Sequence, residues 1–228
     1  MGLKYIWTTI FSPVETFEKI RSEKPALIDS LLIFGFTYLL LLGTAFVVLS
    51  FTEPYYGIRE FVSLFIGIPS MLFLRDPTFK NFLMSVGFAL VDILLLTGIV
   101  HLITKKAGGK GSFSSLLMMF SLTEVVSVVS VLAFLPLQTV MRVGSPFFIL
   151  PFFSIIVGVF VWRFALYFMG IRATYKSKVE TTFLILIVSY IIFSIISVWL
   201  LSFVVKENVI NVIHGMRTKT VAIPEVVD

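Results

Sequence analysis

The sequence predicts an all-α integral membrane protein with five transmembrane helices. Of the 228 residues, 58% are hydrophobic and only 14% are charged, whereas about 25% of residues are charged in soluble domains. The apolar residues gather in long stretches, and a helix of about 20 apolar residues crosses the hydrocarbon core of a bilayer. The predicted spans are residues 27–51, 82–104, 113–137, 147–170 and 181–205. They form one membrane domain, residues 27–205.

The region before the first span, residues 1–26, predicts an amphipathic helix over Pro13–Lys24. The run from Ser12 to Glu15 is a typical helix start, with serine as the N-cap and proline in the first helical position. Phe17 and Ile20 fall on one side of this helix and its charges on the other. That pattern is typical of a helix that lies on the membrane surface, and an ordinary soluble cap is the alternative. The long apolar stretch that follows favours a retained first span over a cleaved signal.

The loop between the first two spans contains a second amphipathic segment, Ile58–Ile68. Arg59 and Glu60 lie on its polar face, and Pro69 follows it. The segment is too short to cross a bilayer and proline ends a helix. We therefore expect an amphipathic helix in the membrane interface, within the first outside loop.

The basic residues near the span ends predict a cytoplasmic N-terminus and a non-cytoplasmic C-terminal tail, residues 206–228. The short loops after the second and fourth spans carry three basic residues each, against one in the loop after the third span. Basic loops stay in the cytoplasm, so the net charge of +5 indicates cytoplasmic loops and contact with anionic lipid, not nucleic acid. In a prokaryote this would be a cell-membrane protein. The residues expected to face lipid or a protein partner are Lys19, Arg21, Lys24, Lys105, Lys106 and Lys110.

Three charged residues fall inside predicted spans: Asp92 in the second, Glu124 in the third and Arg163 in the fourth. Each costs about 2.5–3.5 kcal/mol at a helix centre, so each is expected to face the bundle interior and to have a partner. Arg163 lies about 5–6 Å from Glu124 in depth, within reach of an arginine side chain. A structural ion pair or triad is the first interpretation. The alternatives are a proton or cation relay through Asp92 and Glu124, and protonated carboxyl groups hydrogen-bonded to nearby serines.

The sequence contains no recognised catalytic motif. Its histidines, His101 and His214, have no metal-ligand spacing around them, and there is no cysteine. The run from Gly108 to Ser112 differs from a P-loop because Gly111 separates the lysine from the serine, so a flexible hairpin is expected there. We therefore predict no enzyme activity, metal site or cofactor. Ser30, Thr37 and Thr44 recur at helical spacing in the first span, which indicates close helix packing.

Three motifs occur in order along the chain: Ser12–Ile20 with Pro25 after it, the hairpin Gly108–Phe113, and the segment from Trp162 to Arg172. Together they resemble the Yip-domain (Ypt-interacting protein) membrane proteins. The resemblance covers most of the chain and implies five spans with the N-terminus inside. It also implies a role in membrane organisation, because eukaryotic members sit in early secretory membranes, contact Rab-type GTPases and assist vesicle budding or fusion. The short N-terminal region and the lack of proline early in the third span make the chain more similar to the prokaryotic branch.

From these features we expect a non-enzymatic multi-pass membrane protein that organises the membrane or binds a protein partner at its cytoplasmic face. The bilayer, including anionic lipid, is the expected lipid partner, and homo-oligomerisation is left open. A small ion- or proton-coupled transporter that uses Asp92 and Glu124 is the alternative. A membrane-embedded hydrolase comes third, because no recognised motif flanks the intramembrane carboxylates.

Overall fold

The computed structural model describes residues 4–50, 78–142 and 149–220, where the regular structure is helical and contains no strand. Five of its helices are long and apolar enough to cross a membrane, so the predicted fold class is confirmed. These candidate spans are Leu27–Val48, Phe79–Lys106, Phe113–Ala133, Phe153–Tyr175 and Val179–Leu200. The predicted amphipathic helix Ile58–Ile68 lies outside the described residues.

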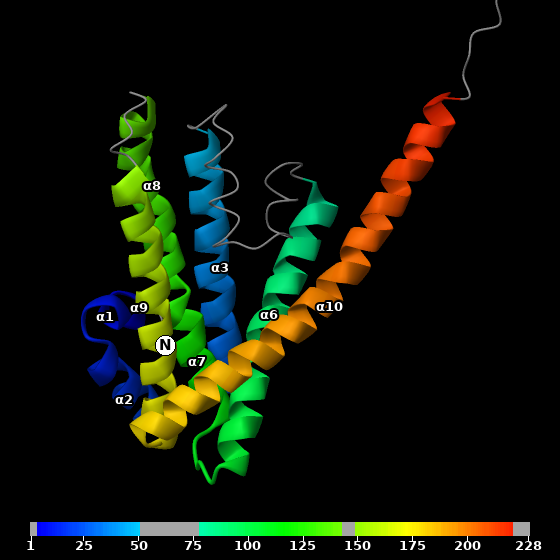
Figure 1. Cartoon of the computed structure of the whole chain (residues 1–228). Coiled ribbons are helices and arrows are strands. Elements are labelled where there is room, and N and C mark those ends of the chain that lie inside the picture. The colour runs from blue at the N-terminus through cyan, green and yellow to red at the C-terminus, as the bar shows by residue number, and fades with distance from the viewer. Residues whose placement is uncertain (1–3, 51–77, 143–148, 221–228) are drawn as a thin grey trace, which may run out of the picture. The chain divides into compact units, whose positions relative to one another are not determined.

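The helices in chain order are α1 (Tyr5–Phe11), α2 (Pro13–Glu23), α3 (Leu27–Ser50), α6 (Phe79–Lys106), α7 (Phe113–Thr123), α8 (Val125–Arg142), α9 (Ile149–Tyr175) and α10 (Val179–Thr220) (Figure 1). The chain divides into two compact units, Met1–Ser189 and Tyr190–Asp228. The first unit contains α1 to α9 and the beginning of α10. In the second unit, α10 continues to Thr220, beyond residue 205, where the fifth span is predicted to end.

The third span is two helices, because α7 ends at Thr123 and α8 begins at Val125. At the junction, the Glu124 N–H donates to the Ser121 carbonyl at 3.3 Å, and the Ser127 N–H donates to the Glu124 carbonyl at 3.0 Å. Both bonds join residues three apart, which is the tighter 3₁₀ pattern. Residues 113–133 contain neither proline nor glycine. The break therefore has no sequence signal of the usual kind.

Helix α7 is at the centre of the first unit, and all its residues from Ser115 to Thr123 are buried. It packs against α3, α6 and α9, and α3 also packs against α8. Two members of the hydroxyl stripe on α3 lie at this contact. The Ser30 hydroxyl donates to the Ser114 carbonyl at 2.8 Å and the Thr37 hydroxyl to the Ser121 carbonyl at 3.2 Å. The stripe thus brings α3 close to α7, as small polar residues do between membrane helices.

The N-terminal helices α1 and α2 pack against each other and against the bundle. The predicted helix start holds, with Pro13 in the first turn, although Ser12 makes no side-chain capping bond. Phe17 and Ile20 are fully buried in a core with Met119 and Leu166, residues of α7 and α9. The expectation that this apolar face contacts the membrane is therefore wrong, because protein covers it.

Different apolar residues of the N-terminal helices remain exposed. Trp7 and Phe11 on α1 and Val14 on α2 expose 67%, 78% and 56% of their surface. If the helices lie in the interface, these residues and not Phe17 or Ile20 would contact lipid. The interfacial position itself stays a prediction.

Candidate functional site

The first candidate site is a polar cluster within the membrane spans, centred on Glu124. Its Oε1 atom lies 2.7 Å from Nη2 of Arg163 on α9. The Tyr167 hydroxyl, one turn further along α9, donates to the same oxygen at 2.8 Å. The Ser127 hydroxyl donates to Oε2 at 3.3 Å. Both carboxylate oxygens therefore accept hydrogen bonds, and the third span is joined to the fourth at the α7–α8 junction.

Other hydroxyl groups near Glu124 bond to backbone instead. The Ser121 hydroxyl donates to the Leu117 carbonyl and the Thr123 hydroxyl to the Met119 carbonyl, each within α7. Tyr167 was not predicted as a member of the cluster. Its position four residues after Arg163 is the signal that identifies it, because residues at this spacing share one face of a helix. Its ring also packs edge-on against Phe120, with centroids 4.5 Å apart.

The third intramembrane charge, Asp92, is half-buried on α6. That helix packs against α7 and α3. The structure brings the other two predicted charges, Glu124 and Arg163, together at the α7–α8 junction. Among the described residues, no group of three or more His, Asp or Glu side chains could hold a metal ion.

The second candidate site lies at the end of the bundle where the α6–α7 hairpin (residues 107–112) meets the end of α9 (Figure 1). A Cβ atom added to Gly111 would lie 2.5 Å from Cγ2 of Thr174, and one added to Gly109 would lie 2.8 Å from Cδ1 of Tyr175. Only glycine fits such close approaches. The hairpin, expected to be flexible, is packed against α9.

His101 supports the same arrangement, because its Nδ1 atom is hydrogen-bonded to the Tyr175 hydroxyl and its ring packs edge-on against Phe113. These contacts join α6, α7 and α9 at one level. Lys105, Lys106 and Lys110 are exposed beside them.

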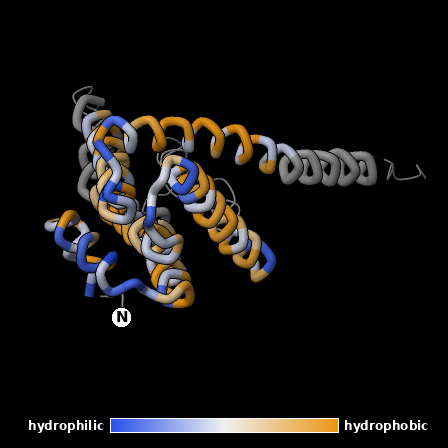
Figure 2. Tube along the Cα trace, turned by 90° about the horizontal axis from the view of Figure 1, so that it is seen from below, coloured by the Kyte–Doolittle hydropathy of each residue, from blue (hydrophilic) through white to orange (hydrophobic). Residues whose placement is uncertain are grey.

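Helix α2 reaches this end of the bundle too. A crevice of about 370 Å³ separates α2 from the end of α9 and the first two residues of the α9–α10 hairpin (residues 176–178). Arg21 is part of its lining, whereas Lys19 and Lys24 are exposed nearby in sequence. Seen from this side, hydrophilic residues mark α2 and the hairpins (Figure 2). We call the surface formed by α2 and the two hairpins the basic end.

Comparison with known proteins gave one match. The family model of the Yip1 domain matches residues 7–206, which run from α1 into α10. A search of the curated proteins and a search of the solved structures found no match.

Proposed function

The chain belongs to the Yip1 domain family, and on this premise we propose that it organises the membrane by holding a protein partner at its basic end. The observation that carries the proposal is the joining of three segments at that end. Gly111 packs against Thr174, and Lys176, two residues later, shares a crevice with Arg21. The exposed lysines at the end of α6 and in the α6–α7 hairpin therefore belong to one continuous basic surface.

We place the basic end in the cytoplasm, because basic residues near span ends are retained there. This gives a cytoplasmic N-terminus, and five crossings then place the C-terminus outside. Such a surface attracts both anionic lipid headgroups and acidic segments of a partner protein. Members of this family are not known as enzymes, and our proposal involves no catalysis.

An ion- or proton-coupled transporter is the alternative, and it would use Asp92 and Glu124. A carboxylate in a relay has to bind and release the transported proton or cation during each cycle. The contacts of Glu124 favour a fixed ion pair, because Arg163 and Tyr167 both donate to Oε1 and Ser127 donates to Oε2. This arrangement supports a structural role for the cluster and hence the scaffold.

Site-specific photocrosslinking in native membranes tests the scaffold. A crosslinker placed at Lys106, Lys110 or Lys24 should give the same protein adduct. One placed at Val161, whose surface is 62% exposed on the apolar wall of α9, should give lipid adducts. The protein in the adduct is identified by mass spectrometry, and that partner is then purified without the crosslink. Binding of the purified partner to the reconstituted chain should weaken when Lys106 and Lys110 are changed to glutamate.

Two outcomes would contradict this proposal. Equal crosslinking to many proteins from Val161 and from Lys106 would show that the basic end selects no partner. A pH-dependent ion flux in liposomes that is lost in a folded Glu124→Gln variant would favour the transporter.

A further inference from the structure

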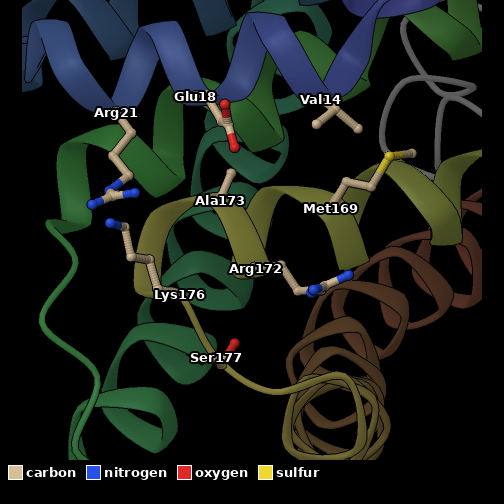
Figure 3. A pocket seen from close by; sticks show the side chains of 8 residues that line it. All are labelled: Val14, Glu18, Arg21, Met169, Arg172, Ala173, Lys176 and Ser177. Carbon is tan, nitrogen blue, oxygen red and sulfur yellow. The ribbon is translucent and has the colours of Figure 1, made fainter.

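The crevice at the basic end is lined by two matching rows of side chains. Helices α2 and α9 pack side by side. Val14, Glu18 and Arg21 follow one another on α2 at a spacing of four and then three residues. Met169 and Ala173 on α9, with Lys176 directly after its last residue, have the same spacing. Residues at this spacing lie on one face of a helix. The two rows face each other across the crevice (Figure 3).

The pairs of side chains that face each other change from apolar to cationic along the crevice. Val14 and Met169 face each other at one end, whereas Arg21 and Lys176 point toward each other at the other end (Figure 3). Arg172 also lines the crevice, but its guanidinium points away from Arg21 and Lys176, toward the side on which Met169 lies (Figure 3). The cationic end is next to the α9–α10 hairpin, so the apolar end lies deeper along α9, toward the middle of its span.

Three cations and one carboxylate line the crevice. The carboxylate, Glu18, lies over Ala173, and no carboxylate of the described residues forms an ion pair with Arg21, Arg172 or Lys176 (Figure 3). Cations that point toward one another repel unless an anion lies between them. The charge pattern therefore fits an anion bound against the cationic end.

Ser177, the remaining polar residue of the lining, is already engaged. Its hydroxyl lies 2.6 Å from that of Thr182, which itself donates to the Lys178 carbonyl. Ser177 is thus the donor to Thr182. An anion in the crevice would be held by the cations alone.

We propose that this crevice binds an anionic glycerophospholipid from the leaflet at the basic end. Arg21 and Lys176 contact the phosphate from two sides, for which a guanidinium group provides paired donors and lysine a point charge. The acyl chain passes along Val14 and Met169. This apolar continuation favours a lipid over free phosphate, which would need only the cationic end. The inference goes beyond the proposed scaffold, because a scaffold that binds no lipid here would still hold its partner.

Thermal unfolding of the purified full chain in detergent tests the site. Added phosphatidylglycerol should raise the unfolding temperature, whereas phosphatidylcholine should raise it much less. The double variant Arg21→Gln, Lys176→Gln should bind phosphatidylglycerol about 30-fold more weakly, in line with the usual worth of two charges near an anionic surface. The matched control Lys19→Gln, Lys110→Gln loses the same charge outside the crevice and should keep the response. Equal loss in both double variants would overturn the proposal in favour of a diffuse basic surface.

A further variant separates lipid from free anion and does not depend on the stability of the charge variants. Val14 is 56% exposed, so Val14→Ser should fold normally. It should weaken the response to phosphatidylglycerol while all three cations remain. An equal response to inorganic phosphate in wild type and Val14→Ser, with no added effect of lipid, would show a free-anion site and contradict the proposal.

Discussion

The carboxylate of Glu124 lies 2.7 Å from the guanidinium of Arg163, and the same glutamate is the residue at which α7 gives way to α8. A break in a membrane helix leaves backbone groups that need other partners, because lipid offers none. At this break the backbone closes with bonds between residues three apart, and the side chain reaches α9. Glu124 therefore lies at the junction of α7 and α8 and also joins this junction to α9.

Removing either partner of this pair should destabilise the protein strongly. Glu124→Gln leaves the Arg163 guanidinium without its anion, and Arg163→Gln leaves the Glu124 carboxylate without its cation. An uncompensated charge in a low-dielectric interior typically costs about 3–5 kcal/mol. The double variant should recover part of the loss, and unfolding of the two single variants and the double variant in detergent measures this coupling. Ser127→Ala is the matched control and should cost about 1 kcal/mol, since it removes one hydrogen bond. Additive losses would mean that the two residues do not interact.

Part of this cluster can be predicted from the sequence. A charge inside a span is costly, so Glu124 and Arg163 identify themselves as residues that need partners, and their depths allow them to meet. The helix break cannot be found in the same way, and the spacing of four residues places Tyr167 on the helix face of Arg163 without showing that it bonds to Glu124. A tyrosine in a span is ordinary, and no proline or glycine marks the junction. The break depends on tertiary contacts that no local pattern encodes.

The N-terminal helix shows a different limit. The spacing of Phe17 and Ile20 correctly identifies an apolar face, but periodicity does not say whether lipid or protein covers that face. The structure buries both residues against α7 and α9. Likewise, the glycines of the α6–α7 hairpin indicate a turn, whereas their close approach to Thr174 and Tyr175 becomes evident only in three dimensions.

Replacing Gly111 with alanine should destabilise the basic end. The new Cβ atom would lie 2.5 Å from Cγ2 and 2.7 Å from the backbone oxygen of Thr174, so backbone as well as side chain must move. Overpacking of this kind costs about 1–3 kcal/mol. Gly98→Ala is the control, because nothing lies within 4 Å of a Cβ at that position in α6. Thermal unfolding of the two variants should differ, and equal stability would show that the hairpin does not pack against α9 as described.

The docking of α1 on α2 should depend on pH. The Tyr5 hydroxyl and the Lys4 ammonium both donate to the Glu23 carboxylate. The hydrogen bond from Tyr5, followed by that from Lys4, lowers the pKa of Glu23, while burial and the bond to Glu23 raise the pKa of Tyr5. The contribution of Glu23 is thus complete above its unfolded pKa of about 4.3 and is lost as the pH falls through its lower folded pKa. The contribution of Tyr5 is complete below about pH 10 and is lost as the pH rises further.

A spin label on a cysteine at Thr8, an exposed position of α1, reports this docking. It should be immobile near neutral pH and become mobile below about pH 4. In Glu23→Gln the label should be more mobile at neutral pH and should lose most of its response to acid. An unchanged acid response in that variant would assign the transition to another group.

The final prediction concerns topology, and the chain is well suited to it because it contains no cysteine. Single cysteines at Lys110 and Lys176 should react with an impermeant maleimide from the same side of the membrane, whatever the orientation. The reason is structural: Gly111, next to Lys110, packs against Thr174, two residues before Lys176. The positive-inside rule makes that side the cytoplasm. After five crossings, a cysteine at Arg217 should react only from outside.

Labelling of Lys110 and Lys176 from opposite sides would contradict the packing of the hairpin, whereas labelling of Arg217 from the cytoplasm would contradict the number of crossings. If all three reactivities exchange sides together, the crossings stand and only the orientation is wrong.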